Sequence, residues 1–254
     1  MNKETNIINI ENLEVKFGKQ VILHDVSLSV KAGEIIGIIG PNGCGKTTLL
    51  NAISGFAQVD SGTISFDGKD IMNLAPNKRA LLGIGRSFQH AGVFKDLTVA
   101  DNIIIGAEKA EKFPWWWMFM PRWRKKMSKI IDASLEEMNL LAHKDSLAGI
   151  LSGGQIRLLE LARLKLFKGK LLLIDEPTAG VAPALRKQLA QVIKTLNKDH
   201  GFTIMVVEHD LKFLFDLVEK VVVLVDGQKY LEDTPENIQQ DKRLQEIYFG
   251  TSSH

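Results

Sequence analysis

Hydrophobic and polar residues alternate near the start of the chain. The alternation covers residues 13–17 and 26–30, and it predicts two strands that each bury one face. A shorter alternation at Ile64 and Phe66 runs into Asp67-Gly68, a dipeptide typical of hairpin turns. These segments predict an N-terminal region of antiparallel β-structure.

Continuous apolar runs form a second pattern. Unbroken runs of this kind are typical of strands buried on both faces of a parallel sheet. Helical periodicity separates the later runs, most clearly over residues 184–197, and this order predicts a mostly parallel α/β sheet. Asp226-Gly227 follows the last run and predicts a final hairpin. The runs are residues 35–39, 171–174, 204–207 and 221–225.

The middle of the chain, about residues 101–168, has a different pattern. It contains few β-like alternations and many helix-forming residues, for example over 127–141. We interpret it as a helical insertion in a single domain that spans residues 1–254. The α/β core of that domain is then made of about residues 1–100 and 169–254.

Composition supports a folded chain with a hydrophobic core. Hydrophobic residues make up 45% of the 254 residues and charged residues 24%, which argues against disorder. The 32 basic and 30 acidic residues leave a net charge of only +2, so we expect no nucleic-acid partner. Cys44 is the only cysteine, which fits a reducing compartment. No apolar run reaches the roughly 18 residues of a membrane span, and Met1–Asn6 carry no apolar signal region.

A glycine-rich loop follows the 35–39 strand. Gly40–Thr47 fits the pattern G-x-x-x-x-G-K-[ST] and precedes a predicted helix over 48–54, which is the context that a phosphate loop needs. The loop amides and the helix N-terminus are expected to cradle phosphate, Lys46 to reach its terminal groups, and the Thr47 hydroxyl to bind Mg²⁺. The candidate contacts are Asn42, Gly43, Cys44, Gly45, Lys46, Thr47 and Thr48.

Two carboxylates end the 171–174 strand. Ligands of open α/β sheets lie beyond the carboxyl ends of strands, so Asp175 and Glu176 can converge with the phosphate loop. We expect Asp175 to hold Mg²⁺ and Glu176 to accept the proton of an attacking water molecule.

A third motif, Leu151-Ser152-Gly153-Gly154-Gln155, precedes an apolar helical pattern over 158–162. A serine cap followed by glycine amides is a second anion-binding helix start. On its own the motif is an ordinary loop.

Together, and in this order, the three motifs resemble the ATP-binding subunits of ABC transporters. The resemblance extends from about Ile8 to Gly250 and implies a P-loop NTPase (RecA-like) core. Ser87-Phe88-Gln89 resembles the Q-loop of that family, residues 207–210 resemble its switch-histidine segment, and Phe17 lies where the family places an aromatic ring on adenine.

The resemblance implies roles for these residues. Two subunits face each other head to tail, and each ATP lies between the phosphate loop of one subunit and the third motif of the other. Gln89 contacts Mg²⁺ and the attacking water, and His209 contacts the γ-phosphate. The implied cofactors are ATP and Mg²⁺, and the residues acting across the dimer are Ser152, Gly153, Gly154 and Gln155.

Two positions depart from the family pattern. Cys44 replaces the alanine or serine often found in the loop, where we interpret it as a small space-filling residue with a potential sensitivity to thiol reagents. Ala182 lies where relatives usually have Asp or Asn, which suggests weakened coupling across the dimer or an unequal partner subunit.

One branch of the family is most similar: the ATPases of importers for branched-chain amino acids and related solutes, including urea-type systems. This similarity rests on residues 83–90, 93–99 and 247–250 and on extra residues before Leu151. Lipopolysaccharide-type exporters use a related ATPase and remain the alternative. The similarity implies integral membrane permease subunits, a second ATP-binding subunit (the same chain or a homologue), and a peripheral place on the cytoplasmic side of the inner membrane.

All four tryptophans lie in the extra segment, beside several basic residues. This composition is typical of a membrane-interface anchor, but packing against protein is the alternative that we favour. The tryptophans are Trp115, Trp116, Trp117 and Trp123.

Two rival functions remain. A soluble ABC protein acting on ribosomes or DNA usually has two cassettes or a long coiled coil, and this chain has one cassette without sustained heptads. A regulatory cassette that binds ATP without hydrolysis is disfavoured by Lys46, Asp175, Glu176 and His209.

Overall fold

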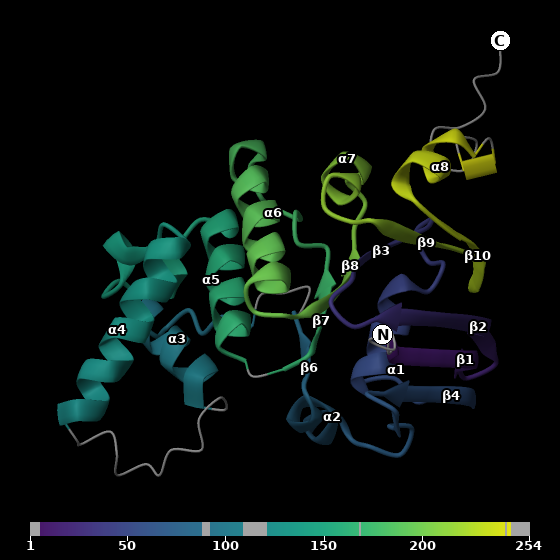
Figure 1. Ribbon diagram of the computed structural model, residues 1–254, viewed down its shortest axis with the longest axis horizontal. Helices are drawn as coiled ribbons and strands as arrows, with labels where there is room; N and C mark the ends of the chain where they lie inside the picture. The colour runs from purple at the N-terminus through teal and green to yellow at the C-terminus, as the bar shows by residue number, and fades with distance from the viewer. Residues whose placement is uncertain (1–5, 88–91, 109–120, 168, 242, 245–254) are drawn as a thin grey trace, which may run out of the picture.

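The computed structural model describes residues 6–87, 92–108, 121–167, 169–241 and 243–244, without the side chains of 107–108 and 121–124. Gln89, Trp115, Trp116, Trp117 and residues 247–250 lie outside the described residues, and so does the side chain of Trp123. Figure 1 shows two sheets, with the helices of the middle of the chain gathered on one side of them.

The N-terminal strands form a four-stranded antiparallel sheet with the order β2-β1-β4-β5. This confirms the predicted antiparallel region. Its strands are β1 (Asn6–Phe17), β2 (Gln20–Lys31), β4 (Ser61–Phe66) and β5 (Lys69–Asp70).

The second sheet has six strands in the order β10-β9-β3-β8-β7-β6. All neighbours pair in parallel except β9 and β10, so the predicted mostly parallel sheet with a final hairpin is confirmed. The strands are β3 (Ile35–Ile39), β6 (Ile84–Arg86), β7 (Leu171–Asp175), β8 (Thr203–Val207), β9 (Lys220–Val225) and β10 (Gln228–Asp233).

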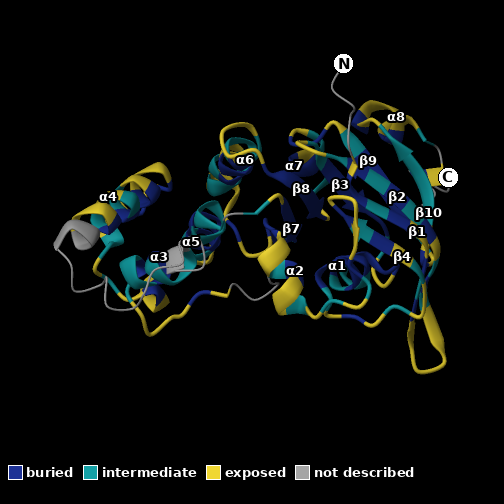
Figure 2. Cartoon of the chain, turned by 60° about the horizontal axis from the view of Figure 1, so that its bottom comes forward, coloured by how far each residue is buried: buried dark blue, intermediate teal, exposed yellow. Residues whose placement is uncertain are grey.

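Alternate residues of the central strands enter two different cores. Leu172 and Ile174 of β7 belong to one apolar cluster, and Leu171 and Leu173 belong to the other. Every residue of β7 and β8 is buried, which explains their continuous apolar sequence (Figure 2). The sheet therefore separates a core shared with the antiparallel sheet from a core shared with the middle helices.

The helices divide between these two cores. Helix α1 (Lys46–Ser54) packs into the core of the antiparallel sheet, and α3 (Val99–Glu108), α4 (Pro121–Glu137), α5 (Gly153–Leu166) and α6 (Pro183–Lys198) pack into the other. The remaining helices are α2 (Pro76–Leu82), α7 (Leu211–Phe215) and α8 (Pro235–Gln240), with short 3₁₀ turns at Leu141–His143 and Ala148–Ile150.

The helix-forming residues over 127–141 extend beyond the end of helix α4. The helix stops at Glu137 because Asn139 adopts a left-handed conformation with φ 54°. Leu140 N–H then bonds to Leu135 O at 2.7 Å and closes the helix end. Within the part of the chain that the structure describes, no helix combines the length and apolar character needed to cross a membrane.

Candidate functional site

The glycine-rich loop joins the end of β3 to the start of α1. Gly45 is the N-cap of α1 with φ 101°, and it provides no side-chain cap for the first-turn amides. The loop is tightly packed, because a Cβ at Gly45 would lie 2.4 Å from Leu23 Cδ2. Asn42 and Gly43 are exposed at the tip, whereas Cys44 is buried and Thr47 and Thr48 are half-buried. The loop thus presents a helix N-terminus whose first amides have no side-chain cap, which suits a phosphate group.

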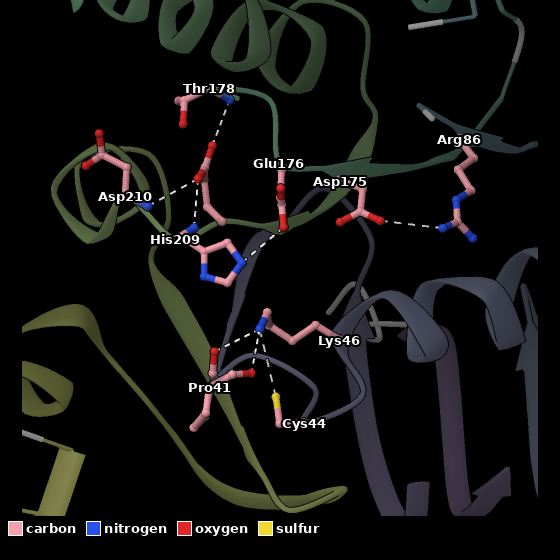
Figure 3. A network of polar contacts seen from close by, with 11 residues as sticks. Pro41, Cys44, Lys46, Arg86, Asp175, Glu176, Thr178, His209 and Asp210 are labelled. Carbon is pink, nitrogen blue, oxygen red and sulfur yellow. Dashed lines mark hydrogen bonds and ion pairs between the residues drawn. The ribbon is translucent and has the colours of Figure 1, made fainter. Parts of the chain in front are cut away.

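Lys46 lies across this loop rather than pointing into solvent. Its ammonium donates to Gly40 O at 2.8 Å and to Pro41 O at 2.9 Å (Figure 3). The side chain is only 6% exposed, so it holds a positive charge inside the loop. The carbonyl groups of Gly40 and Pro41 thus hold the Lys46 ammonium group where phosphate oxygens would approach.

Cys44 fills space inside the loop, as its small size predicts. Its Sγ lies 4.0 Å from Lys46 Nζ and 2.5 Å from where a Cβ at Gly40 would stand. Burial raises the pKa of the thiol, and the Lys46 charge opposes that shift only in part.

Asp175 ends β7 and is 1% exposed. Neither carboxylate oxygen has a hydrogen-bond donor among the described residues, and Arg86 Nη2 lies 3.6 Å from Oδ2. Burial raises the pKa of this carboxyl group, while Arg86, Thr47 and Lys46 act in the opposite direction. Buried carboxylate oxygens without donors, beside the Thr47 hydroxyl, fit a hard divalent cation such as Mg²⁺.

Glu176 follows Asp175 and turns away from the strand, with φ 47°. Its Oε1 lies 3.0 Å from His209 Nε2, and its N–H donates to Val207 O at 2.9 Å (Figure 3). The side chains of Glu176 and His209 are 25% and 41% exposed, so water can reach both. A carboxylate and an imidazole in contact, open to water, can exchange a proton with a bound water molecule.

Sequence reasoning missed two charged residues of this site, Glu208 beside His209 and Arg86 beside Asp175. Glu208 is 3% exposed and accepts hydrogen bonds from Thr178 N, His209 N and Asp210 N. Arg86 donates from Nη1 to Ser54 Oγ at 2.7 Å and pairs with Asp175. The only sign of either residue in the sequence is a charged side chain next to a motif. Local spacing does not show which distant residue such a side chain contacts.

The third motif begins α5 with a complete capping box. Ser152 Oγ accepts from Gln155 N, and Gln155 Oε1 accepts from Ser152 N at 2.9 Å. A Cβ at Gly153 would lie 2.9 Å from Gly180 O, and one at Gly154 would lie 2.5 Å from Leu185 Cδ1.

The third motif and the phosphate loop therefore lie apart within one chain. The helices that they begin, α5 and α1, pack into the two different cores on opposite faces of the six-stranded sheet. The structure brings together the phosphate loop, Asp175, Glu176 and His209, and it does not bring Ser152–Gln155 to the same site.

Phe17 and Ala182 are the remaining residues that the sequence analysis singled out. Phe17 ends β1 and is 56% exposed, so its ring is accessible to a ligand. Ala182 is the N-cap of α6 and makes no side-chain cap bond.

Comparison with known proteins places these features in a family. Residues 23–179 match the family model described as ABC transporter. A probable branched-chain amino acid transport ATP-binding protein, LivG, of Methanocaldococcus jannaschii is 35% identical, covering 98% of this chain and 100% of the relative. The high-affinity branched-chain amino acid transport ATP-binding protein BraF of Pseudomonas aeruginosa is 32% identical, covering 96% of this chain and 98% of the relative.

A solved structure agrees with these matches. The crystal structure of an ATP-binding cassette of an ABC transporter in its ADP conformation superposes with a TM-score of 0.82. It is 35% identical and covers 97% of this chain and 99% of that one.

Proposed function

The chain belongs to the ABC transporter family, and we propose that it is the ATP-hydrolysing subunit of an importer for branched-chain amino acids or a related small solute. The relatives whose names describe branched-chain amino acid transport support import over lipopolysaccharide-type export. We further propose that residues 1–254 form one ATP-binding domain, with residues 101–168 as the helical insertion. The observation that carries the proposal is the convergence of Lys46, Asp175, Glu176 and His209 at the carboxyl edge of the parallel sheet.

The residues of this chain have distinct tasks in hydrolysis. Loop amides and Lys46 hold the terminal phosphates, with Lys46 leaving the carbonyls of Gly40 and Pro41. Glu176 accepts the proton of the attacking water, and His209 orients Glu176 and contacts the γ-phosphate. Mg²⁺, held by Thr47 and Asp175 with Gln89, would neutralise charge on the phosphates. Phe17 stacks on the adenine ring.

A second ATP-binding subunit completes each site. Within one chain, Ser152–Gln155 and the phosphate loop lie apart, so the capped N-terminus of α5 is available for the ATP of a partner subunit. The partner is a second copy of this chain or a homologue, and alanine at 182, where relatives usually have Asp or Asn, favours an unequal pair.

Permease subunits are the expected membrane partners. We propose that they dock in a cleft between the α/β part of the chain and the helical insertion. The cleft has a volume of about 580 Å³ and includes Phe56, Arg86, Phe94 and Arg163 in its lining. Arg163 of α5 donates to Gly92 O and lies 5.3 Å from the Phe94 ring centroid, so the cleft joins the insertion to the segment after Gln89. Phe56 and Phe94 are 57% and 49% exposed, which suits an apolar cytoplasmic segment of a permease.

The proposed location is peripheral, on the cytoplasmic side of the inner membrane. A membrane-surface contact through Trp115, Trp116, Trp117 and Trp123 is a separate proposal, with packing against protein as its rival. Liposome flotation of a variant with Trp115, Trp116 and Trp117 changed to serine distinguishes the membrane-surface contact from packing against protein. Unchanged binding to anionic vesicles contradicts the surface contact.

Two measurements test the main proposal. Purified protein is expected to hydrolyse ATP, and Glu176→Gln is expected to bind ATP and co-purify with integral membrane proteins from detergent extracts. Co-purification of soluble partners alone would contradict the transport role and leave the ATP site intact. Phe94→Asp tests the cleft by loss of co-purification, with Leu141→Asp, 40% exposed in the wild type and outside the cleft, as the matched control.

A further inference from the structure

Glu208 lies between two loops that meet at the catalytic pair. One loop, residues 177–182, follows Glu176, and the other, residues 208–210, carries His209. Glu208 Oε1 accepts Thr178 N–H at 2.8 Å, and Oε2 accepts His209 N–H at 2.7 Å and Asp210 N–H at 3.2 Å. One carboxylate therefore holds the backbone of both loops.

The geometry of Glu208 requires a carboxylate. Its three bonds all arrive from N–H donors, and the side chain is 3% exposed, so water cannot replace the bonds. Glutamine has the same size, but its amide offers one acceptor oxygen and one donor nitrogen. A glutamine at this position leaves at least one loop without its partner.

A second contact supports the same link. Arg186 of α6 pairs with Asp210, and its Nε donates to Val181 O at 3.5 Å. Asp210 Oδ1 in turn caps α7 by accepting Phe213 N–H at 3.0 Å. The two loops are thus joined at Thr178 and again at Val181.

The 177–182 loop also contacts the third motif. Gly180 O lies 2.9 Å from the Cβ position of Gly153, and Val181 Cγ1 lies 3.4 Å from that of Gly154. A side chain at either glycine would therefore meet the 177–182 loop, so the start of α5 lies close to that loop.

We propose that Glu208 is a positioning residue that aligns the His209–Glu176 pair with the 177–182 loop. This inference rests on the proposed function, because it assumes ATP hydrolysis at that pair. It assigns Glu208 no contact with ATP. Glu208 acts through the backbone of His209 and of the 177–182 loop.

Glu208→Gln in the full-length protein tests the proposal. We expect kcat to fall by about 10- to 100-fold, since a displacement of about 1 Å at a catalytic group can cost 10²-fold. The Kd for a fluorescent ATP analogue is expected to change by less than about twofold, because the phosphate loop is not among the partners of Glu208. The control Glu34→Gln removes a carboxylate that accepts Lys31 N–H at 2.8 Å before β3 and is expected to retain kcat.

The results distinguish a wrong role for Glu208 from a wrong proposed function. Unchanged kcat in Glu208→Gln, or an equal loss in Glu34→Gln, overturns the positioning role. A wild-type protein without ATPase activity overturns the proposed function instead.

Hydrogen exchange in the wild-type protein gives a second test that does not depend on folding of the variant. On ATP addition, peptides containing Thr178 and His209 are expected to gain protection at the same nucleotide concentration. Protection of only one of the two peptides contradicts a shared carboxylate link.

Discussion

His209 Nε2 lies 3.0 Å from Glu176 Oε1, although the two residues are 33 positions apart in the sequence. They follow the neighbouring parallel strands β7 and β8, and Asp175 pairs with Val207 in that register. The left-handed conformation of Glu176 turns its side chain toward the histidine. The candidate base is therefore held by a partner from the end of the neighbouring strand.

Glu176→Gln is expected to lower the ATPase rate about 10²- to 10⁴-fold, since the amide cannot accept the water proton. ATP binding is expected to persist, because the phosphate loop is unchanged. Steady-state turnover and equilibrium ATP binding check the two statements. Glu236→Gln, which changes an exposed carboxylate on α8, is the matched control, and full turnover in Glu176→Gln would remove Glu176 from the role of base.

Lys46→Ala is expected to weaken ATP binding by about 10- to 100-fold, because it removes a charge-assisted bond to phosphate worth about 1.5–3 kcal/mol. Equilibrium titration with a fluorescent ATP analogue measures the change. Lys170→Ala removes a lysine whose side chain is 57% exposed and is expected to leave affinity unaltered. Equal affinity of Lys46→Ala and wild type would contradict the phosphate-loop assignment.

Ala182→Asp is expected to stabilise the protein by about 1 kcal/mol, since aspartate at the N-cap of α6 can accept a first-turn amide bond that alanine cannot. Thermal unfolding is expected to show a Tm higher by about 2–4 °C. Ala182→Val changes the same position without an acceptor and should show no such gain. A lower Tm in Ala182→Asp would indicate that the present backbone cannot form the cap.

Alkylation of Cys44 is expected to be slow near neutral pH. Burial raises the pKa of the thiol, so less of the reactive thiolate is present at a given pH than in the unfolded chain, and the rate continues to rise to a higher pH. Mass spectrometry of iodoacetamide-treated native and denatured protein measures both profiles at this single cysteine.

The alkylated protein is expected to lose ATP affinity, because Cys44 Sγ packs against Gly40 and Lys46 inside the phosphate loop. Unchanged affinity after complete alkylation would contradict this expectation. Faster alkylation of native than of denatured protein would contradict the raised pKa.

The elements that sequence analysis located correctly have local signals. Residues 35–39 form β3 as predicted, because an apolar run with a glycine-rich loop after it has few alternatives in an α/β fold. The helix after that loop begins at Lys46 rather than residue 48, since the loop itself supplies the N-cap. The end of α4 could not be read from composition, because helix-forming residues continue to Leu141 while one left-handed residue, Asn139, ends the helix.

The sequence by itself determined the motifs and their order, because glycine spacing, strand-end carboxylates and helix caps depend on residues within a few positions of one another. Only the tertiary structure decided that Glu208 holds Thr178, that Arg86 faces Asp175, and that Gly153 lies close to Gly180. The residues of these pairs are 27 to 89 positions apart in the sequence, with Gly153 and Gly180 the nearest and Arg86 and Asp175 the farthest. Their partners are selected by strand order and by packing on each sheet face, which no local spacing encodes.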